Sequence, residues 1–202
     1  MSTKTSQVGG GFDRGQIELL LGEVASIAAR RNVSVSMFLV GGAAIALAYS
    51  TDRATTDLDG VFEPKAVVYE IAEEVAANHP EFRLQPDWIN DAVKGFLIGD
   101  DPDSTVRFER PGLAVSVASP RYLFKMKAMA ARESDVDDLR LLFRLAGYQN
   151  AAEALADVEM AYRGQPVKMS SQYLIEEIAS ESQTASALSP RPDEANSCPD
   201  HR

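Results

Sequence analysis

The stretch VGGAAIALAYSTDRATTDLDGVFEP, residues 40–64, decides the fold of this chain. It opens with the glycine pair Gly41 and Gly42, continues through an apolar segment, and reaches Asp57 and Asp59 with one leucine between them. The pattern predicts a strand, a glycine turn, a helix and a returning strand. In that arrangement the glycines and the aspartates would form two walls of one site.

The glycine pair ends a buried strand predicted over residues 36–40 and leads into a helix predicted over 43–49. Glycine allows the main chain to turn sharply and allows a ligand to approach closely. The N-terminus of a helix offers exposed N–H groups and a partial positive charge, so a phosphate is the expected ligand. We therefore expect Gly41 and Gly42 to bind the phosphates of a nucleotide.

The two aspartates lie at the start of the second predicted strand, residues 58–62. Side chains alternate along a strand, so Asp57 and Asp59 should point to the same side while Leu58 points into the core. One or two carboxylates together with substrate phosphates are a typical Mg²⁺ site. The pair therefore predicts bound Mg²⁺, with Mn²⁺ as an alternative.

Either motif alone is typical of an ordinary turn or of a solvated loop. Their combination, with 14 residues between Gly42 and Asp57, favours a functional site. A phosphate cradle beside a carboxylate metal site is the machinery of nucleotidyl transfer from a nucleoside triphosphate (NTP).

This stretch resembles the nucleotidyltransferase superfamily, which has the fold of DNA polymerase β. The family pattern is Gly-Gly or Gly-Ser, about ten or more residues, and then Asp-x-Asp. Within the superfamily the stretch most resembles the AbiE-type (AbiEii-like) and MenT-type toxins, whose version adds Arg-x-Thr before the aspartates. Arg53 and Thr55 match that form, and the resemblance implies that both bind the nucleotide.

A second segment, SPRYLFKMKAMAARESDVDDLRLLFRLAG over residues 119–147, resembles the same toxin family. The resemblance implies that Lys127 contacts the nucleotide in catalysis, that Asp135 supports the catalytic site, and that Asp138 is a further nucleotide-binding candidate. Lys125 competes with Lys127, since the two point about 200° apart around a helix; the resemblance favours Lys127. Alternatively, the aspartates are ordinary helix-start residues that complement the helix dipole.

One departure from the family concerns a third carboxylate, which polymerase-type members carry on a later strand. The corresponding strand is predicted over residues 113–117 and has no carboxylate. Glu109, just before it, is the remaining candidate. Trp88 is predicted to be a packing residue rather than a platform for a base.

The element pattern predicts an α+β fold, with a small nucleotidyltransferase-type mixed sheet and flanking helices over residues 13–118 and a helical lobe over 119–183. Residues 1–12 are predicted to be a flexible lead-in, and the Ser- and Pro-rich segment 184–202 a disordered tail. Ser134 is predicted to cap the helix that follows it, and residues 87–91 to form a turn or a short helix. The remaining helices are predicted over 14–31, 65–78, 120–132, 135–146, 150–162 and 170–183, and the remaining strands over 105–110 and 113–118.

The composition narrows the class of protein. There is no apolar run of membrane-spanning length and no apolar signal-peptide core near the start, so we expect a cytoplasmic protein without a membrane partner. The single cysteine, Cys198, permits no internal disulfide, and two histidines make a Cys/His zinc site improbable. The net charge of −10 argues against a protein that coats nucleic acid. RNA binding would need a local basic face, and an ordinary salt-bridged surface is the alternative for the arginines concerned, Arg121, Arg132, Arg140 and Arg144.

These observations predict an Mg²⁺-dependent nucleotidyltransferase that moves a nucleoside monophosphate from an NTP to an acceptor hydroxyl and releases pyrophosphate. The toxin resemblance implies an RNA acceptor such as the tRNA 3′ end, and a toxin of a toxin–antitoxin or phage-defence system with a cognate antitoxin as partner. Two alternatives stay open. One is an enzyme that adenylylates a partner protein or a small molecule, and the other is a non-catalytic nucleotide-binding module.

Overall fold

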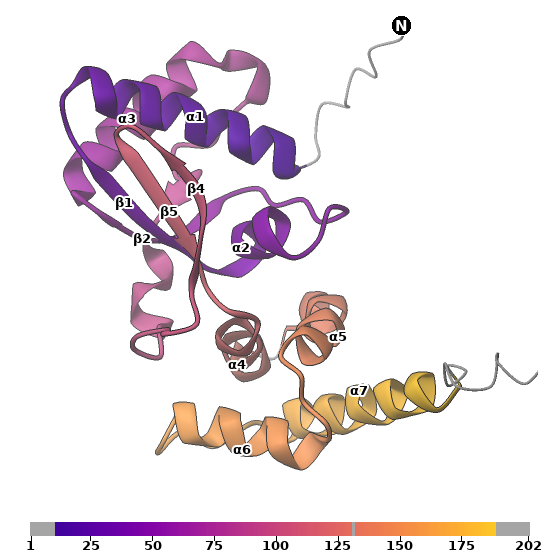
Figure 1. The fold of residues 1–202 in the computed structure, drawn as a ribbon. Coiled ribbons are helices and arrows are strands. Elements are labelled where there is room, and N and C mark those ends of the chain that lie inside the picture. Colours follow the sequence, from indigo (N-terminus) through magenta and orange to yellow (C-terminus); the bar gives the residue numbers. More distant parts are fainter. Residues whose placement is uncertain (1–10, 131, 189–202) are drawn as a thin grey trace, which may run out of the picture. The chain divides into compact units, whose positions relative to one another are not determined.

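A computed structural model of the chain describes residues 11–130 and 132–188. The chain divides into two compact units, residues 1–127 and 128–202. The division falls inside helix α4 (Pro120–Ala130), whereas the sequence places a boundary just before that helix. Figure 1 shows a sheet with its helices in the first unit and helices in the second.

The first unit is an α+β body built on a five-stranded mixed sheet in the order β3-β2-β1-β5-β4. Strand β1 pairs antiparallel with β2 and parallel with β5, while β3 runs parallel to β2 and β4 antiparallel to β5. The strands are β1 (Val35–Leu39), β2 (Leu58–Glu63), β3 (Ile89–Asn90), β4 (Thr105–Arg110) and β5 (Leu113–Val117). The helices are α1 (Arg14–Arg30), α2 (Gly41–Ala48), α3 (Lys65–Asn78) and the first part of α4, with the short 3-10 turns η1 (Pro80–Phe82) and η2 (Ala92–Phe96).

One face of this sheet is buried, and we call it the covered face. In β1, Val35, Met37 and Leu39 point to this face and are at most 3% exposed. Helices α1 and α3 pack against each other and against the sheet (Figure 1). The predicted apolar face of α1 is buried, and so are Val68, Ile71 and Val75 of α3, whereas Val67 is only half-buried. The opposite face, which we call the open face, carries the alternate residues Ser36 and Phe38 of β1, which are exposed and half-buried.

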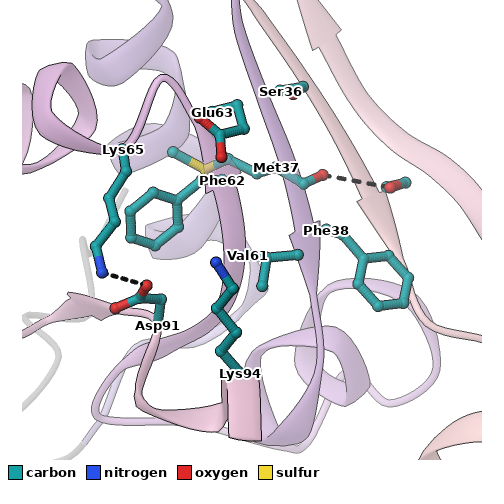
Figure 2. A pocket seen from close by; sticks show the side chains of 10 residues that line it. Ser36, Met37, Phe38, Val61, Phe62, Glu63, Lys65, Asp91 and Lys94 are labelled. Atoms are coloured by element: carbon teal, nitrogen blue, oxygen red, sulfur yellow. Dashed lines mark hydrogen bonds and ion pairs between the residues drawn. The ribbon is translucent and has the colours of Figure 1, made fainter. Parts of the chain in front are cut away.

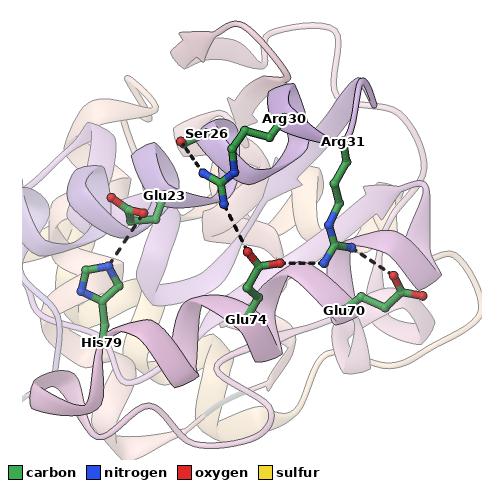
Figure 3. Close-up of polar contacts among 7 residues, drawn as sticks. All are labelled: Glu23, Ser26, Arg30, Arg31, Glu70, Glu74 and His79. Carbon is green, nitrogen blue, oxygen red and sulfur yellow. Dashed lines mark hydrogen bonds and ion pairs between the residues drawn. The ribbon is translucent and has the colours of Figure 1, made fainter.

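The ends of α1 are fixed by polar contacts. Asp13 and Gln16 form a capping box at its start. At its end, Arg31 binds Glu74 at 2.7 Å and Glu70 at 3.1 Å on α3 (Figure 3). Both partners of the 2.7 Å pair are about one-third exposed, with side chains 34% and 35% accessible, so each such pair contributes little beside the apolar packing.

The segment predicted as a flexible lead-in is ordered at its end, and there the prediction is wrong. Phe12 forms an isolated antiparallel bridge with Thr55. Its side chain is 7% exposed and its ring packs edge-on against Phe82, with centroids 6.4 Å apart. The bridge is a tertiary contact over a long sequence distance, so local composition gives no sign of it. Residues 1–10 lie outside the described residues.

The segment predicted as a turn or a short helix, residues 87–91, contains strand β3, so this prediction is wrong for Ile89 and Asn90. The strand exists because Leu58 and Asp59 of β2 pair with it in parallel, and a two-residue pairing leaves no periodicity in a sequence. Trp88 packs in the core as predicted: it is 1% exposed and its indole N–H donates to the main-chain oxygen of Ala72 at 3.2 Å.

The second unit contains helices α5 (Val136–Leu145), α6 (Ala151–Ala161) and α7 (Met169–Leu188), after the 3-10 turn η3 (Glu133–Asp135). The three helices were predicted. The capping role of Ser134 was not correct, because Ser134 lies within η3 and Asp135 occupies the N-cap of α5. Helix α7 continues to Leu188, so the prediction of a disordered tail is wrong for residues 184–188. Residues 189–202 lie outside the described residues.

Contacts within the second unit join its helices. Arg140 on α5 donates to Glu181 on α7 at 2.8 and 3.0 Å and to Asp137 at 3.2 Å. This ion pair supports the salt-bridged alternative for Arg140 rather than a basic RNA-binding face. Among the described helices of the chain, none is long and apolar enough to cross a membrane.

Candidate functional site

The glycine pair forms the first turn of α2. The helix begins at Gly41, two residues earlier than the sequence predicts, with Val40 as its N-cap in an extended conformation. Among the described residues no side chain caps this helix, so its first N–H groups lack a side-chain acceptor within that part of the chain. Gly41 has φ +61°, in the left-handed region that favours glycine.

Gly41 lies directly against Asp59. A Cβ atom built on Gly41 would be 3.4 Å from Oδ2 of Asp59 and 3.8 Å from its Cβ. The main-chain N–H of Val40 donates to the main-chain oxygen of Asp59 at 2.9 Å. The structure thus brings the glycine pair and the aspartate pair of residues 40–64 next to each other. A side chain at position 41 would fill the space between the helix N-terminus and the carboxylate.

Thr55 contacts both Gly42 and Asp57, the second glycine and the first aspartate of the two motifs. Its hydroxyl donates to the main-chain oxygen of Asp57 at 3.1 Å and lies 3.4 Å from Oδ1 of the same residue. A Cβ atom on Gly42 would be only 2.8 Å from Oγ1 of Thr55. Thr55 itself is 9% exposed, and the bridge to Phe12 holds its backbone on the other side. These contacts place Thr55 between the glycine turn and Asp57.

Asp57 and Asp59 flank Leu58 as the alternation predicts. Leu58 is fully buried and its N–H donates to the main-chain oxygen of Trp88 at 2.7 Å, whereas both aspartates are half-buried. In the described part of the chain there is no group of three or more His, Cys, Asp or Glu residues that could hold a metal ion. Two carboxylates suit Mg²⁺ when substrate phosphates supply further oxygen ligands, so the donor set here fits a metal that arrives with a nucleotide.

The sheet order bears on the third carboxylate. Glu109 lies on β4, three strands away from β2, which corresponds to roughly 14 Å at the spacing of paired strands. The strand that the sequence suggested for this role, β5, pairs with β1 and not with β2. The other neighbour of β2 is β3, which places Asn90 beside Asp59. The amide oxygen of Asn90 accepts from the N–H of Ala92 at 3.1 Å.

The other predicted residues are distributed over both units. Arg53 is half-buried in the loop before Thr55, and Lys127 is half-buried on α4. Asp135 and Asp138 are 7% and 6% exposed at the start of α5, in the second unit. A contribution of Lys127, Asp135 or Asp138 to the site stays a prediction.

A pocket of about 380 Å³ opens on the first unit, and it was not predicted from the sequence (Figure 2). Half of its lining residues belong to the open face, and the others are the alternate residues of β1 and β2, one residue of α3, and one residue each just before and within η2. They fall in four separate stretches of the sequence, 36–38, 61–65, 91–94 and 116, so a linear reading finds no motif. The lining residues are Ser36, Met37, Phe38, Val61, Phe62, Glu63, Lys65, Asp91, Lys94 and Ser116.

The rim of the pocket carries a fixed ion pair and a second lysine. Lys65 binds the carboxylate of Asp91, which also accepts from the hydroxyl of Tyr69 at 2.7 Å (Figure 2 shows the ion pair). Hydrogen bonds from Lys65 and then Tyr69 lower the pKa of Asp91, and the hydrogen bond to Asp91 raises the pKa of Lys65. Among the described residues, Lys94 makes no ion pair within 4.0 Å.

No protein-family model matches the chain, and the comparisons with curated proteins and with solved structures gave no match. The mixed sheet with its helices establishes an α+β arrangement. A nucleotidyltransferase fold and activity stay predictions, supported by the motifs and by the geometry around Asp59.

Proposed function

We propose that the protein is an Mg²⁺-dependent nucleotidyltransferase, which transfers a nucleoside monophosphate from an NTP to an acceptor hydroxyl. The observation that carries the proposal is the contact between Gly41 and Asp59. The place where a Cβ would stand is 3.4 Å from the carboxylate, at the N-terminus of a helix that no described side chain caps. A phosphate at this helix end and a metal on Asp59 would therefore be adjacent.

Each part of the site has a physical role in this reaction. The N–H groups at the start of α2 and the helix dipole would hold the phosphates of the NTP. Asp57 and Asp59 would hold Mg²⁺, which would supply positive charge to the phosphates. Thr55 keeps Asp57 in place through its hydroxyl. The acceptor hydroxyl would lose its proton to water, its oxygen would bond to the α-phosphorus as the bond to the β-phosphate oxygen breaks, and pyrophosphate would leave.

For the acceptor we propose an RNA, with the tRNA 3′ end as the first candidate and growth arrest as the biological result. The support is the Arg-x-Thr-x-Asp-x-Asp form of residues 53–59 and the lysine and aspartates of residues 127–138, which resemble the toxin branch. In this reading Arg53 and Lys127 would steady the triphosphate charge, and a cognate antitoxin would be the partner.

The test is incubation of the purified protein with labelled NTPs, Mg²⁺ and total RNA, beside the Asp57→Ala variant. We expect labelled RNA with the wild type and a loss of at least about 100-fold with Asp57→Ala, because the metal loses a carboxylate ligand. Label on a co-expressed protein instead would favour the protein-modifying alternative. Absence of any labelled product with either protein would reject the enzyme.

A further inference from the structure

The pocket on the open face lies beside the proposed transfer site and has no role in it so far (Figure 2). We propose that this pocket binds the terminal nucleotide of an RNA acceptor, with Lys94 at the phosphate of that nucleotide. The inference rests on the proposed function and deepens it, because it names where the acceptor is held and by which side chains.

The register of the sheet gives the position of the pocket relative to Asp59. Asp59, Val61 and Glu63 alternate with buried residues along β2 and so share the open face. Opposite Val61 stands Phe38 of β1, while Gly60 stands opposite Leu39. The chain then continues from β1 into the glycine turn. Along the sheet, Asp59 therefore lies between the glycines on one side and the pocket on the other.

This order suits an in-line transfer. The attacking oxygen and the leaving pyrophosphate lie on opposite sides of the α-phosphorus. If the phosphates of the NTP bind at the start of α2, the acceptor must approach Asp59 from the other direction. Val61 is one side-chain repeat beyond Asp59, roughly 7 Å along the strand. A group seated over Val61 and Phe38 can therefore present a hydroxyl at Asp59.

The lining of the pocket matches a nucleotide. Phe38 and Val61 are half-buried and offer an apolar floor for a base or a ribose. The ring of Phe38 is supported edge-on by Tyr122, with centroids 5.7 Å apart, so the floor is held in place. The hydroxyl of Ser36 stands on the same face and can hydrogen-bond with the polar edge of a base. The hydroxyl of Ser116 donates to the main-chain oxygen of Met37 at 3.3 Å and can still accept a hydrogen bond. A pocket of about 380 Å³ lies within the usual range for small-molecule groups.

The lining carries two lysines and two carboxylates, and Lys94 is the lysine that makes no ion pair within 4.0 Å among the described residues. Lys65 is engaged by Asp91, whose carboxylate also acts on Lys94 at longer range. Lys94 is therefore the side chain to which an anionic occupant would bind. Figure 2 shows Lys94 pointing up from η2 toward Val61. A phosphate attached to the seated nucleotide would satisfy this cation. A serine or tyrosine side chain would bring no anion to Lys94.

The experiment compares two matched pairs of variants in the labelling assay with a defined RNA acceptor. Ser36→Trp fills the pocket, and Ser34→Trp places the same side chain two residues earlier at an exposed position outside it. Lys94→Ala removes the cation, and Lys168→Ala removes an exposed lysine from the second unit. We expect Ser36→Trp and Lys94→Ala to raise the KM for RNA by about tenfold or more, with the KM for NTP changed less than about twofold. The control variants should behave as the wild type.

A binding measurement separates this inference from the proposed function. Fluorescence anisotropy of a short fluorescein-labelled RNA with a free 3′ end should show weaker binding to Ser36→Trp than to Ser34→Trp, whether or not transfer occurs. Weaker binding without any labelled product would support the pocket and reject the enzyme. Equal KM and equal binding across both pairs would overturn the pocket while leaving nucleotidyl transfer intact. Label that goes only to protein would overturn RNA as the occupant.

Discussion

The two faces of the sheet in the first unit come from the same strands and differ in what they can tolerate. On the covered face, Met37 and Leu39 of β1 are 3% and 0% exposed and are enclosed by α1 and α3. On the open face, Asp59 and Val61 of β2 are only half-buried. Because side chains alternate, the packed residues fix the backbone position of the residues beside them. The packed residues of the covered face thus hold the residues of the open face in position.

The difference predicts two kinds of mutational effect. A change on the covered face should lower the free energy of unfolding and should affect activity only through it. A change on the open face should affect activity with the free energy of unfolding nearly unchanged. Asp59 and Gly60, which are neighbours on β2, test this difference. It would be contradicted if a change at Asp59 lowered activity and the free energy of unfolding together, or if a change at Gly60 lowered activity alone.

The largest effect is expected on the open face, for Asp59→Asn. Loss of one carboxylate ligand should lower nucleotidyl transfer by about 100-fold or more, while the thermal midpoint stays within about 2 °C of the wild type. Labelling with NTP and a growth test on expression measure the first quantity, and a thermal melt the second. Glu109→Gln, three strands away on β4, is the matched control and should retain full activity. Equal losses in both variants would remove the assignment of Asp59.

The next effect is expected on the covered face, for Gly60→Ala. A Cβ atom at this position would lie 2.3 Å from the main-chain oxygen of Phe38, and backbone cannot move aside as a side chain can. We expect a loss of about 3 kcal/mol in the free energy of unfolding, measured by urea denaturation. Gly95→Ala, which meets no atom within 4 Å, should differ little from the wild type. A mild effect at Gly60 would mean that β1 and β2 separate more easily than the register implies.

Thr55 is a buried residue of the site and should show both effects, each of them small. Thr55→Val removes the hydroxyl that holds Asp57, which should cost about 1 kcal/mol of stability and lower transfer by about tenfold. Thr55→Ser keeps the hydroxyl and should restore the transfer rate. If Ser and Val variants are equally active, the hydroxyl does not position Asp57.

The smallest effect concerns pH and the rim of the pocket. The pKa of Asp91 is lowered in the folded state by hydrogen bonds from Lys65 and Tyr69. Its contribution to stability is therefore complete above the unfolded-state pKa of about 3.9 and is lost as the pH falls through the lower folded-state pKa. We expect the difference between wild type and Asp91→Asn in urea midpoints to be largest above about pH 5 and to shrink toward pH 2. A constant difference at every pH would mean that Asp91 acts through packing alone.

Much of the fold could be predicted from the sequence because its elements carry strong local signals. Helices α1 and α3 have clear periodicity, and the β4–β5 hairpin is marked by Pro111 and Gly112. Strand β3 and the Phe12 bridge could not be predicted, because each depends on one or two residues paired with a distant segment. Pairing of that kind is set by tertiary contacts and not by propensity.

The candidate site, too, could be predicted only in part. Alternation around Leu58 and the position of the glycines were enough to predict that Gly41 and Asp59 belong together. The link made by Thr55 could not be predicted, because it depends on how close Oγ1 of Thr55 lies to Gly42, 2.8 Å from the place of a Cβ atom. The strand beside Asp59 could not be predicted either, because only the sheet order shows that it is β3 and not β5. The pocket could not be predicted because its lining residues are scattered along the chain.

The bridge between Phe12 and Thr55 also determines where an added peptide would emerge. Gly11 lies so close to Thr55 that a Cβ atom there would be 2.4 Å from its main-chain oxygen. Whatever is fused ahead of residue 11 therefore leaves the fold two residues from Asp57. A segment joined directly at residue 11 would therefore start beside the proposed nucleotide site, and a comparison of the activity of the protein with and without such a segment measures that effect.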